Sequence, residues 1–177
     1  MSSMQLRLTG SGGQGVILAS VILAEAAVIA GKYTAQSQSY GPEARGGSCK
    51  AECIVSDVPI GFTKVLRPTF LLCLTQKSLD EYAPAAQGAT ILIDDTLSLK
   101  NAPDGARVIA LPILRTAKEK TGKSFTANIT AVGAINRLLS IVSDKDIEKA
   151  VLMHIPAGTE EINLTALRAG QSLADGV

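Results

Sequence analysis

Strand-like and helix-like hydrophobic patterns alternate from one end of the chain to the other. Short segments that are apolar, or that alternate between apolar and polar residues, indicate strands, whereas apolar stripes with helical spacing indicate helices. The expected strands cover residues 4–9, 33–37, 48–56, 69–75, 90–93 and 107–111. The expected helices cover residues 15–30, 76–86, 112–120, 128–142, 145–153 and 160–173. This alternation predicts a single α/β domain over residues 1–177, with an open, mostly parallel sheet and helices on both faces.

Local patterns add detail to three of these elements. Gly31 stands where a glycine commonly ends a helix, directly after the segment 15–30. Ser143 followed by Asp146 resembles a capping box at the start of a helix. In the segment 48–56, small apolar residues alternate with Lys50 and Glu52, which predicts a strand with one buried and one polar side.

The composition narrows the class of protein. Apolar residues make up 46% of the chain, charged residues 19%, and the formal net charge is +1, which excludes a disordered tail and a general attraction to nucleic acid or anionic membranes. The longest apolar run, 16–30, contains Glu25 and is shorter than the roughly 20 residues of a membrane span. The N-terminus lacks the layout of an export signal. We therefore expect a cytoplasmic protein without nucleic-acid partners or a membrane span.

The three cysteines are interpreted as small buried hydrophobic residues in a reducing compartment. Cys49 and Cys53 lie on one side of an alternating segment, Cys73 lies in another expected strand, and no CxxC pair is present. The single histidine, His154, is remote from all three. The sequence thus offers no ligand set for zinc or an iron–sulfur cluster, and no metal site is expected.

Residues 10–15, Gly-Ser-Gly-Gly-Gln-Gly, lie directly between the first expected strand and the first expected helix. Gly10, Gly12 and Gly15 fit the G-x-G-x-x-G spacing of Rossmann-like turns, in which N–H groups at the helix start bind a phosphate or diphosphate. A nicotinamide site usually adds an acidic residue about 20 positions later, and residues 32–39 contain none. The pattern favours an anionic ligand other than NAD. A glycine turn needed only for strand–helix packing is the alternative.

A polar, glycine-dense segment, residues 36–47, follows the second expected strand and is predicted to be a loop. The loop would emerge at the same carboxyl edge of the sheet as the glycine turn, where open parallel sheets bind ligands. Gly46 lets the backbone approach a ligand closely, and Arg45 offers a planar group that suits phosphate or carboxylate. The alternative is a solvated turn with a local ion pair between Glu43 and Arg45, worth only about 0–1 kcal/mol.

Together, GSGGQGV at residues 10–16 and QSQSYGPEARGG at residues 36–47 resemble the gamma subunit of 2-oxoacid:ferredoxin (or acceptor) oxidoreductases. The resemblance is strongest over residues 7–57 and continues more loosely through 69–75 and 128–139, so that it covers most of the chain. The paired motifs are much more specific than the glycine turn alone. Their sequences are most similar to those of short gamma subunits that act on 2-oxoglutarate or branched-chain 2-oxoacids. The resemblance implies the fold of domain III of the fused pyruvate enzymes.

The resemblance implies a division of labour within a hetero-oligomer. Thiamine diphosphate is expected between the alpha and beta subunits, where decarboxylation takes place. Iron–sulfur clusters are expected on beta or on a separate delta subunit, and ferredoxin or flavodoxin is expected to accept the electrons. The gamma subunit is expected to receive coenzyme A and to contact alpha and beta, with Tyr40 as a candidate contact with alpha. An isolated chain is expected to self-associate, for example as a homodimer, because its subunit contacts are exposed.

The resemblance also assigns candidate residues. The expected coenzyme A site comprises Ser11, Gly12, Gly13, Gln14, Gly15, Arg45, Gly46 and Asn128. The segment 11–15 would face the phosphates, and Arg45 would bind the same negative charge. Asn128 would donate a hydrogen bond, with an ordinary helix N-cap as the equal alternative. No residue is expected to be catalytic, because the subunit acts by orienting the coenzyme A thiol.

Two other kinds of function compete with this interpretation. One is a stand-alone nucleotide-dependent oxidoreductase with a Rossmann-like half, which the missing acidic residue disfavours. The other is a purely structural subunit whose glycine loops only dock onto partners. Binding of NAD by the isolated chain would favour the first alternative. Coenzyme A held entirely by the partner subunits would favour the second.

Overall fold

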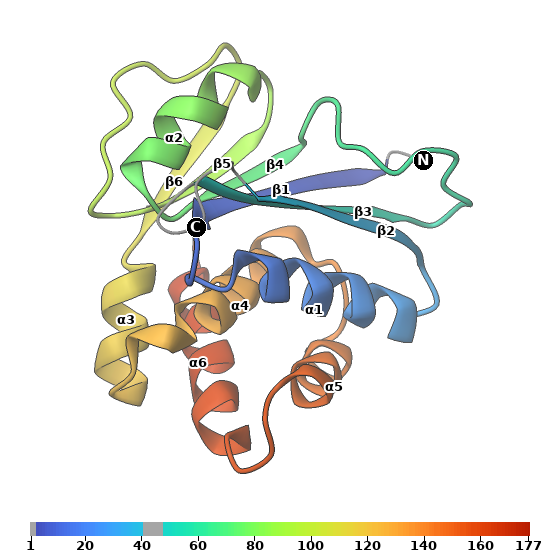
Figure 1. Cartoon of the computed structure of the whole chain (residues 1–177), viewed down its shortest axis with the longest axis vertical. Helices are drawn as coiled ribbons and strands as arrows, with labels where there is room; N and C mark the ends of the chain where they lie inside the picture. Colours follow the sequence, from blue (N-terminus) through green and yellow to red (C-terminus); the bar gives the residue numbers. More distant parts are fainter. Residues whose placement is uncertain (1–2, 41–47) are drawn as a thin grey trace.

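The computed structural model describes residues 3–40 and 48–177, which form one six-stranded sheet and its covering helices. The strands are β1 (Met4–Ser11), β2 (Tyr33–Tyr40), β3 (Ser48–Ser56), β4 (Phe70–Cys73), β5 (Thr90–Asp94) and β6 (Arg107–Leu111). Their order in the sheet is β2-β3-β1-β4-β5-β6 (Figure 1). β1, β4, β5 and β6 run parallel to one another. β3 is antiparallel to both of its neighbours, β1 and β2. The predicted mostly parallel sheet is confirmed, with β3 as its exception.

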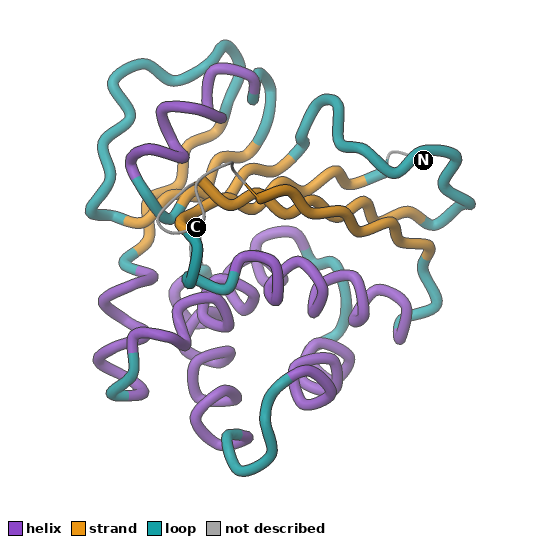
Figure 2. The backbone as a smooth tube through the Cα atoms, viewed as in Figure 1, coloured by secondary structure: helices purple, strands orange, loops and turns teal. Residues whose placement is uncertain are grey.

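Helices cover both faces of the sheet, as predicted. They are α1 (Val16–Ile29), α2 (Gln76–Tyr82), α3 (Ile113–Thr121), α4 (Ala127–Leu139), α5 (Asp144–His154) and α6 (Glu160–Leu173), with short 3₁₀ turns η1 (Ala83–Ala85) and η2 (Ser124–Thr126). Figure 2, in the view of Figure 1, shows α2 on one face of the sheet, with α1, α4, α5 and α6 on the opposite face. No described helix is both long and apolar enough to cross a membrane.

Side chains of the central strands alternate between two hydrophobic clusters. Leu71 and Ile91 pack beneath α2 in the smaller cluster, whereas Leu72 and Leu92 point into the larger cluster that includes α1 and α4. Because successive residues of a strand point to opposite faces, strands buried on both sides must be apolar at every position. This explains the continuous apolar runs of β4 and β5.

Helix α1 is apolar on nearly all sides because it is enclosed between the sheet, α4 and α5. The helix ends at the predicted glycine. Gly31 has a φ of 76°, and the Lys32 N–H donates a 2.9 Å hydrogen bond to the Ala27 carbonyl across this turn. A glycine adopts this left-handed conformation without a steric penalty, so it both ends the helix and directs the chain into β2.

Helices α4 and α6 approach each other until their backbones touch. A Cβ atom on Gly133 would collide with the Leu167 carbonyl oxygen, and one on Gly170 would collide with the Thr130 carbonyl oxygen. Only glycine leaves room for this contact at both positions. The pair of glycines therefore fixes the spacing of the two helices.

One expectation about β2 is wrong. The strand was expected to end at residue 37, but residues 38–40 of the expected loop continue it, with Gln38 paired opposite Ala51 and Tyr40 opposite Cys49. The polar side chains are tolerated because β2 is an edge strand. Its backbone groups toward the sheet are satisfied by β3 whatever the side chains are.

The expected polar side of β3 is also only partly exposed. Glu52 is 6% exposed, and its Oε1 lies 2.8 Å from Arg7 Nε. The loop between β3 and β4 closes over this pair, because Arg7 Nη2 donates to the Val65 carbonyl at 2.7 Å and the Val65 N–H donates to Glu52 Oε2 at 3.3 Å. A carboxylate that is paired and hydrogen-bonded in this way is tolerated in the interior.

Candidate functional site

The glycine turn at residues 10–15 joins the end of β1 to the start of α1. Gly13 has a φ of 97° and Gly15 a φ of 70°, so both adopt backbone conformations that other residues rarely take. Gly12 and Gly13 are exposed, and a Cβ on either would meet no atom within 4 Å. Among the backbone hydrogen bonds of turns and loops within residues 3–40 and 48–177, none is donated by the N–H group of Gly12 or Gly13. These two amides are available to a ligand.

Gln14 closes the inner side of the same turn. Its Oε1 accepts a 2.7 Å hydrogen bond from the Ser11 N–H, and its Nε2 donates to the Leu74 carbonyl at 3.3 Å. A Cβ on Gly10 would lie 2.6 Å from that Oε1. The Ser11 amide is thus used within the protein. Of the predicted segment 11–15, Gly12 and Gly13 are the exposed residues with open amides.

The start of α1 carries no compensating negative group. No described side chain caps it, and its first turn contains no acidic residue. By contrast, α5 begins with Asp144 and Asp146, and α6 begins with Glu160 and Glu161. The unpaired N–H groups and the helix dipole together leave positive potential at the start of α1.

Asn128 lies directly against Gly15. Its side chain is 6% exposed, Nδ2 donates to the Gly15 carbonyl at 3.4 Å, and Oδ1 accepts from the Ile129 N–H at 2.9 Å. A Cβ on Gly15 would lie 2.5 Å from Asn128 Nδ2. The N-cap position of α4 belongs to Thr126, so the alternative of an ordinary N-cap at Asn128 is wrong. The residue joins the start of α1 to α4.

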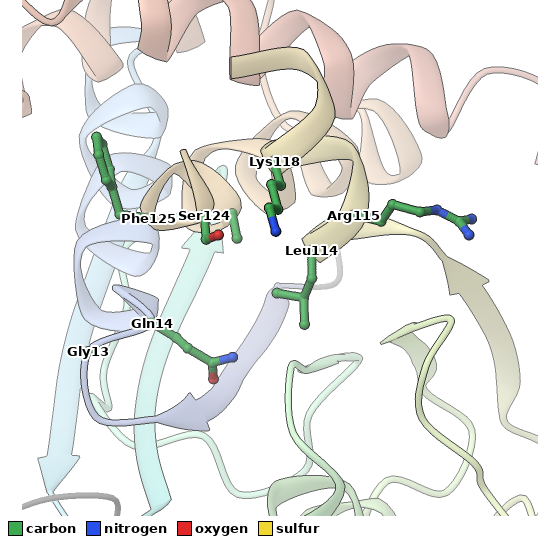
Figure 3. A pocket seen from close by; sticks show the side chains of 8 residues that line it. Gly13, Gln14, Leu114, Arg115, Lys118, Ser124 and Phe125 are labelled. Carbon is green, nitrogen blue, oxygen red and sulfur yellow. The ribbon is translucent and has the colours of Figure 1, made fainter. Parts of the chain in front are cut away.

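A pocket of about 630 Å³ opens beside the glycine turn. It lies between the turn, the start of α3 and the η2–α4 junction, and it is lined by Gly13, Gln14, Leu114, Arg115, Lys118, Ser124, Phe125 and Ala127. Figure 3 shows the Lys118 side chain directed from α3 into the space above Gln14, whereas Arg115 extends away from it. Arg115 pairs with Asp95 at 3.0 Å, while none of the ion pairs among the described residues engages Lys118.

Lys118 is therefore a candidate ligand-binding residue that the sequence analysis missed. The signal in the sequence was the basic character of the helix after Pro112, which carries Arg115, Lys118 and Lys120. Which of these cations faces the glycine turn depends on the packing of α3 beside β6, and no local pattern shows it. An exposed lysine next to open amides adds a second positive group for an anion.

The second candidate segment is only partly described. β2 ends at Tyr40 and β3 begins at Ser48, and both strand ends lie at the same edge of the sheet as Gly10 and Ser11. The expected position of the segment between these ends stays a prediction. Arg45 and Gly46 lie outside the described residues.

All three cysteines are buried, as predicted. Burial raises the pKa of Cys53 to about 12 and that of Cys73 to about 11, and it also raises the pKa of Cys49. Thiols with such pKa values stay protonated near neutral pH and are poor nucleophiles and metal ligands. No cluster of three or more potential metal-binding side chains occurs in the described part of the chain.

Comparison with known proteins connects this geometry to a family. The model of the pyruvate ferredoxin/flavodoxin oxidoreductase family matches residues 5–173. The chain belongs to this family. It is 44% identical to the 2-oxoglutarate synthase subunit KorC of Methanocaldococcus jannaschii, over 96% of this chain and 93% of the relative.

Two solved structures share the fold. The gamma subunit of a keto/oxoacid ferredoxin oxidoreductase from Geobacter sulfurreducens is 41% identical, with a TM-score of 0.86 over 98% of this chain and 99% of that one. The 2-oxoglutarate:ferredoxin oxidoreductase of Magnetococcus marinus, solved with 2-oxoglutarate, coenzyme A and succinyl-CoA bound, is 20% identical. Its TM-score is 0.91 over 100% of this chain and 32% of that chain. The resemblance to gamma subunits that the paired motifs indicated is confirmed.

Proposed function

We propose that this chain is the gamma subunit of a thiamine-diphosphate-dependent 2-oxoacid:ferredoxin oxidoreductase and that the pocket beside its glycine turn holds coenzyme A. The observation that carries the proposal is the uncapped start of α1, where Gly13 lines the pocket that Lys118 enters and the open Gly12 amide precedes it in the same turn. The Magnetococcus marinus relative, which shares the fold, was solved with coenzyme A bound.

The charges and the size of the pocket suit this ligand. Coenzyme A carries a diphosphate, which needs several N–H donors and at least one cation, and the helix start together with Lys118 supplies both. A volume of about 630 Å³ lies within the range of pockets that enclose small organic ligands. Arg45 and Gly46 lie outside the described residues, and their place in the same site is proposed from the sequence motif alone.

The contribution of the chain is the orientation of coenzyme A. When the diphosphate is fixed at the carboxyl edge of the sheet, the pantetheine arm is directed toward the partner subunits. Their thiamine diphosphate supplies the decarboxylation chemistry. A thiol that is held in place reacts as if it were at a very high local concentration, and this effect requires no acid, base or nucleophile from the gamma subunit.

We assign 2-oxoglutarate as the favoured 2-oxoacid, because the relative at 44% identity is named a 2-oxoglutarate synthase subunit. The proposed partners are alpha and beta subunits, with iron–sulfur clusters on beta or on a delta subunit. Ferredoxin or flavodoxin is the proposed electron acceptor of the complex, and the cytoplasm is its proposed location.

The decisive experiment obstructs the open amides in the assembled complex. Gly12→Val places a side chain where a Cβ meets no atom within 4 Å, so the fold is expected to tolerate it. Loss of one charge-assisted hydrogen bond corresponds to about 1.5–3 kcal/mol, so the KM for coenzyme A should rise by about tenfold or more. Release of carbon dioxide from the 2-oxoacid without coenzyme A should be unchanged.

Gly61→Val is the matched control. Gly61 lies in the loop between β3 and β4, is exposed, and also has no atom within 4 Å of an added Cβ. Its replacement should leave the KM for coenzyme A unchanged. An unchanged KM in Gly12→Val, with the complex intact, would show that coenzyme A is held by other subunits and that the chain has a docking role only.

A further inference from the structure

A second pocket of about 540 Å³ adjoins the first. It lies between the end of α3, η2 and the start of α6, and it is lined by Lys120, Thr121, Lys123, Phe125, Gly158, Thr159, Glu161, Ile162 and Thr165. Phe125 lines both pockets, so the two pockets meet at this residue. The proposed coenzyme A site therefore has a neighbouring compartment of similar size.

Two cations of this second pocket have no counter-ion among the described residues. Lys120 and Lys123 are both exposed, and none of the ion pairs between described side chains involves either of them. The hydroxyl groups of Thr121 and Thr159 are already hydrogen-bonded to the protein, at 2.6 Å to the Ala117 and Pro156 carbonyls respectively. The two ammonium groups are thus the charged donors that line this pocket without a counter-ion.

The start of α6 does not serve as the anion site itself. Glu160 and Glu161 occupy its first turn, and Glu160 Oε1 accepts a 3.1 Å hydrogen bond from the Gly158 N–H. The helix dipole is therefore compensated by the protein's own carboxylates. An anion here has to be bound by Lys120 and Lys123, while Glu161 remains as a hydrogen-bond acceptor for a different part of the ligand.

Phe125 forms the boundary between the two pockets and is 62% exposed. The chain contains only three phenylalanines, three tyrosines and no tryptophan, so few of its side chains can stack on a base. More than half of Phe125 is not used for packing among the described residues and is accessible to a ligand. Stacking of a base on an aromatic ring contributes about 1–3 kcal/mol.

We infer that the second pocket binds the 3′-phosphoadenosine end of coenzyme A. Lys120 and Lys123 bind the 3′-phosphate, Phe125 stacks on the adenine, and Glu161 accepts a hydrogen bond from the adenine amino group. The inference rests on the proposed function, because a diphosphate at the glycine turn is what brings the adenosine to Phe125. It makes the second pocket the part of the site that distinguishes coenzyme A from dephospho-coenzyme A, which lacks the 3′-phosphate.

The test measures the dissociation constants of both compounds on the assembled complex. The wild type should bind coenzyme A about tenfold or more tightly than dephospho-coenzyme A, as expected for hydrogen bonds to a charged phosphate. The double variant Lys120→Met, Lys123→Met should lose this preference while its affinity for dephospho-coenzyme A stays the same. Lys145→Met, at an exposed lysine in the first turn of α5, is the control and should keep the preference.

A second variant separates the base from the phosphate. Phe125→Leu should raise the dissociation constants of coenzyme A and dephospho-coenzyme A by the same factor, about tenfold. It should not change the binding of 4′-phosphopantetheine, which lacks the adenosine. This pattern differs from general damage to the fold, which would weaken all three compounds.

The outcomes distinguish a failure of this inference from a failure of the proposed function. If the wild type binds coenzyme A and dephospho-coenzyme A equally well, the second pocket does not bind the 3′-phosphate, although the site at the glycine turn stands. The same conclusion follows if the double lysine variant binds both compounds more weakly by the same factor. If Gly12→Val leaves coenzyme A binding intact, both the proposed function and this inference fail.

Discussion

Among the described helices, α1, α2 and α3 each directly follow a parallel strand of the sheet, and they begin in two different ways. At α2, Thr75 Oγ1 accepts a 3.2 Å hydrogen bond from the Ser78 N–H, and at α3, Asp94 Oδ2 accepts a 2.8 Å hydrogen bond from the Leu114 N–H. The start of α1 has a glycine in place of such a side chain. The protein closes two helix starts with its own oxygen atoms and leaves the third open.

The difference shows what turns a common structural feature into a ligand site. Every helix has free N–H groups at its start, and a capping side chain usually satisfies some of them with a gain of about 1 kcal/mol. The chain forgoes this gain at α1, where Gly12 and Gly13 also keep the approach free of side chains. Replacing the residues that close or open these starts tests whether the distinction is real.

The largest effect is expected at the closed start of α3. The Asp94 side chain is fully buried and accepts hydrogen bonds from Leu114 N–H, Thr96 N–H at 3.2 Å and Thr96 Oγ1 at 2.6 Å. Asp94→Ala removes a buried carboxylate and all three of these hydrogen bonds, so the free energy of unfolding should fall by about 3 kcal/mol. Urea denaturation of the purified chain, followed by circular dichroism, measures the change.

Asp95→Ala is the matched control for this variant. Asp95 is the next residue and forms a partly exposed ion pair with Arg115, which is worth less than about 1 kcal/mol. Equal destabilisation by the two substitutions would show that Asp94 does not hold the start of α3 through its buried hydrogen bonds.

A smaller loss is expected at the open start of α1. Gly15→Ala forces a left-handed conformation on alanine and places its Cβ 2.5 Å from Asn128 Nδ2. The free energy of unfolding should fall by about 2 kcal/mol. Gly12→Ala, in the same turn but without either constraint, should change it by less than about 0.5 kcal/mol. Similar thermal midpoints for these two variants would contradict the different roles of the two glycines.

The smallest effect is expected at the closed start of α2. Thr75→Ala removes the oxygen that caps Ser78 and should lower the free energy of unfolding by about 1 kcal/mol. Thr75→Ser keeps an oxygen at that position and should retain most of the stability. A serine variant as unstable as the alanine variant would indicate that the threonine methyl group, and not the cap, stabilises α2. Chemical denaturation resolves the difference.

Features set by neighbouring residues were predictable from the sequence. The glycine turn between β1 and α1, the Gly31 helix end, and Ser143 capping Asp146 all appear in the structure. The bounds of α6, Glu160–Leu173, are those expected. In each case, a few adjacent side chains determine the local conformation, so the pattern alone was sufficient.

Features that depend on distant segments were not predictable. Asn128 contacts Gly15 across 113 positions in the sequence, and Glu52 is buried because a loop and Arg7 meet it from other segments. Lys118 enters the first pocket only because α3 packs beside the glycine turn. No periodicity or motif contains this information. The roles of Arg45 and Gly46 remain predictions from the motif.

The backbone contact between α4 and α6 has a consequence for ligand selectivity. The first pocket ends on the start of α4 and the second on the start of α6, and Gly133 and Gly170 join the two helices with no side chain between them. A compressible layer of side chains would let the two compartments drift apart. The direct backbone contact instead fixes their separation and, for the proposed ligand that spans both pockets, the length that fits.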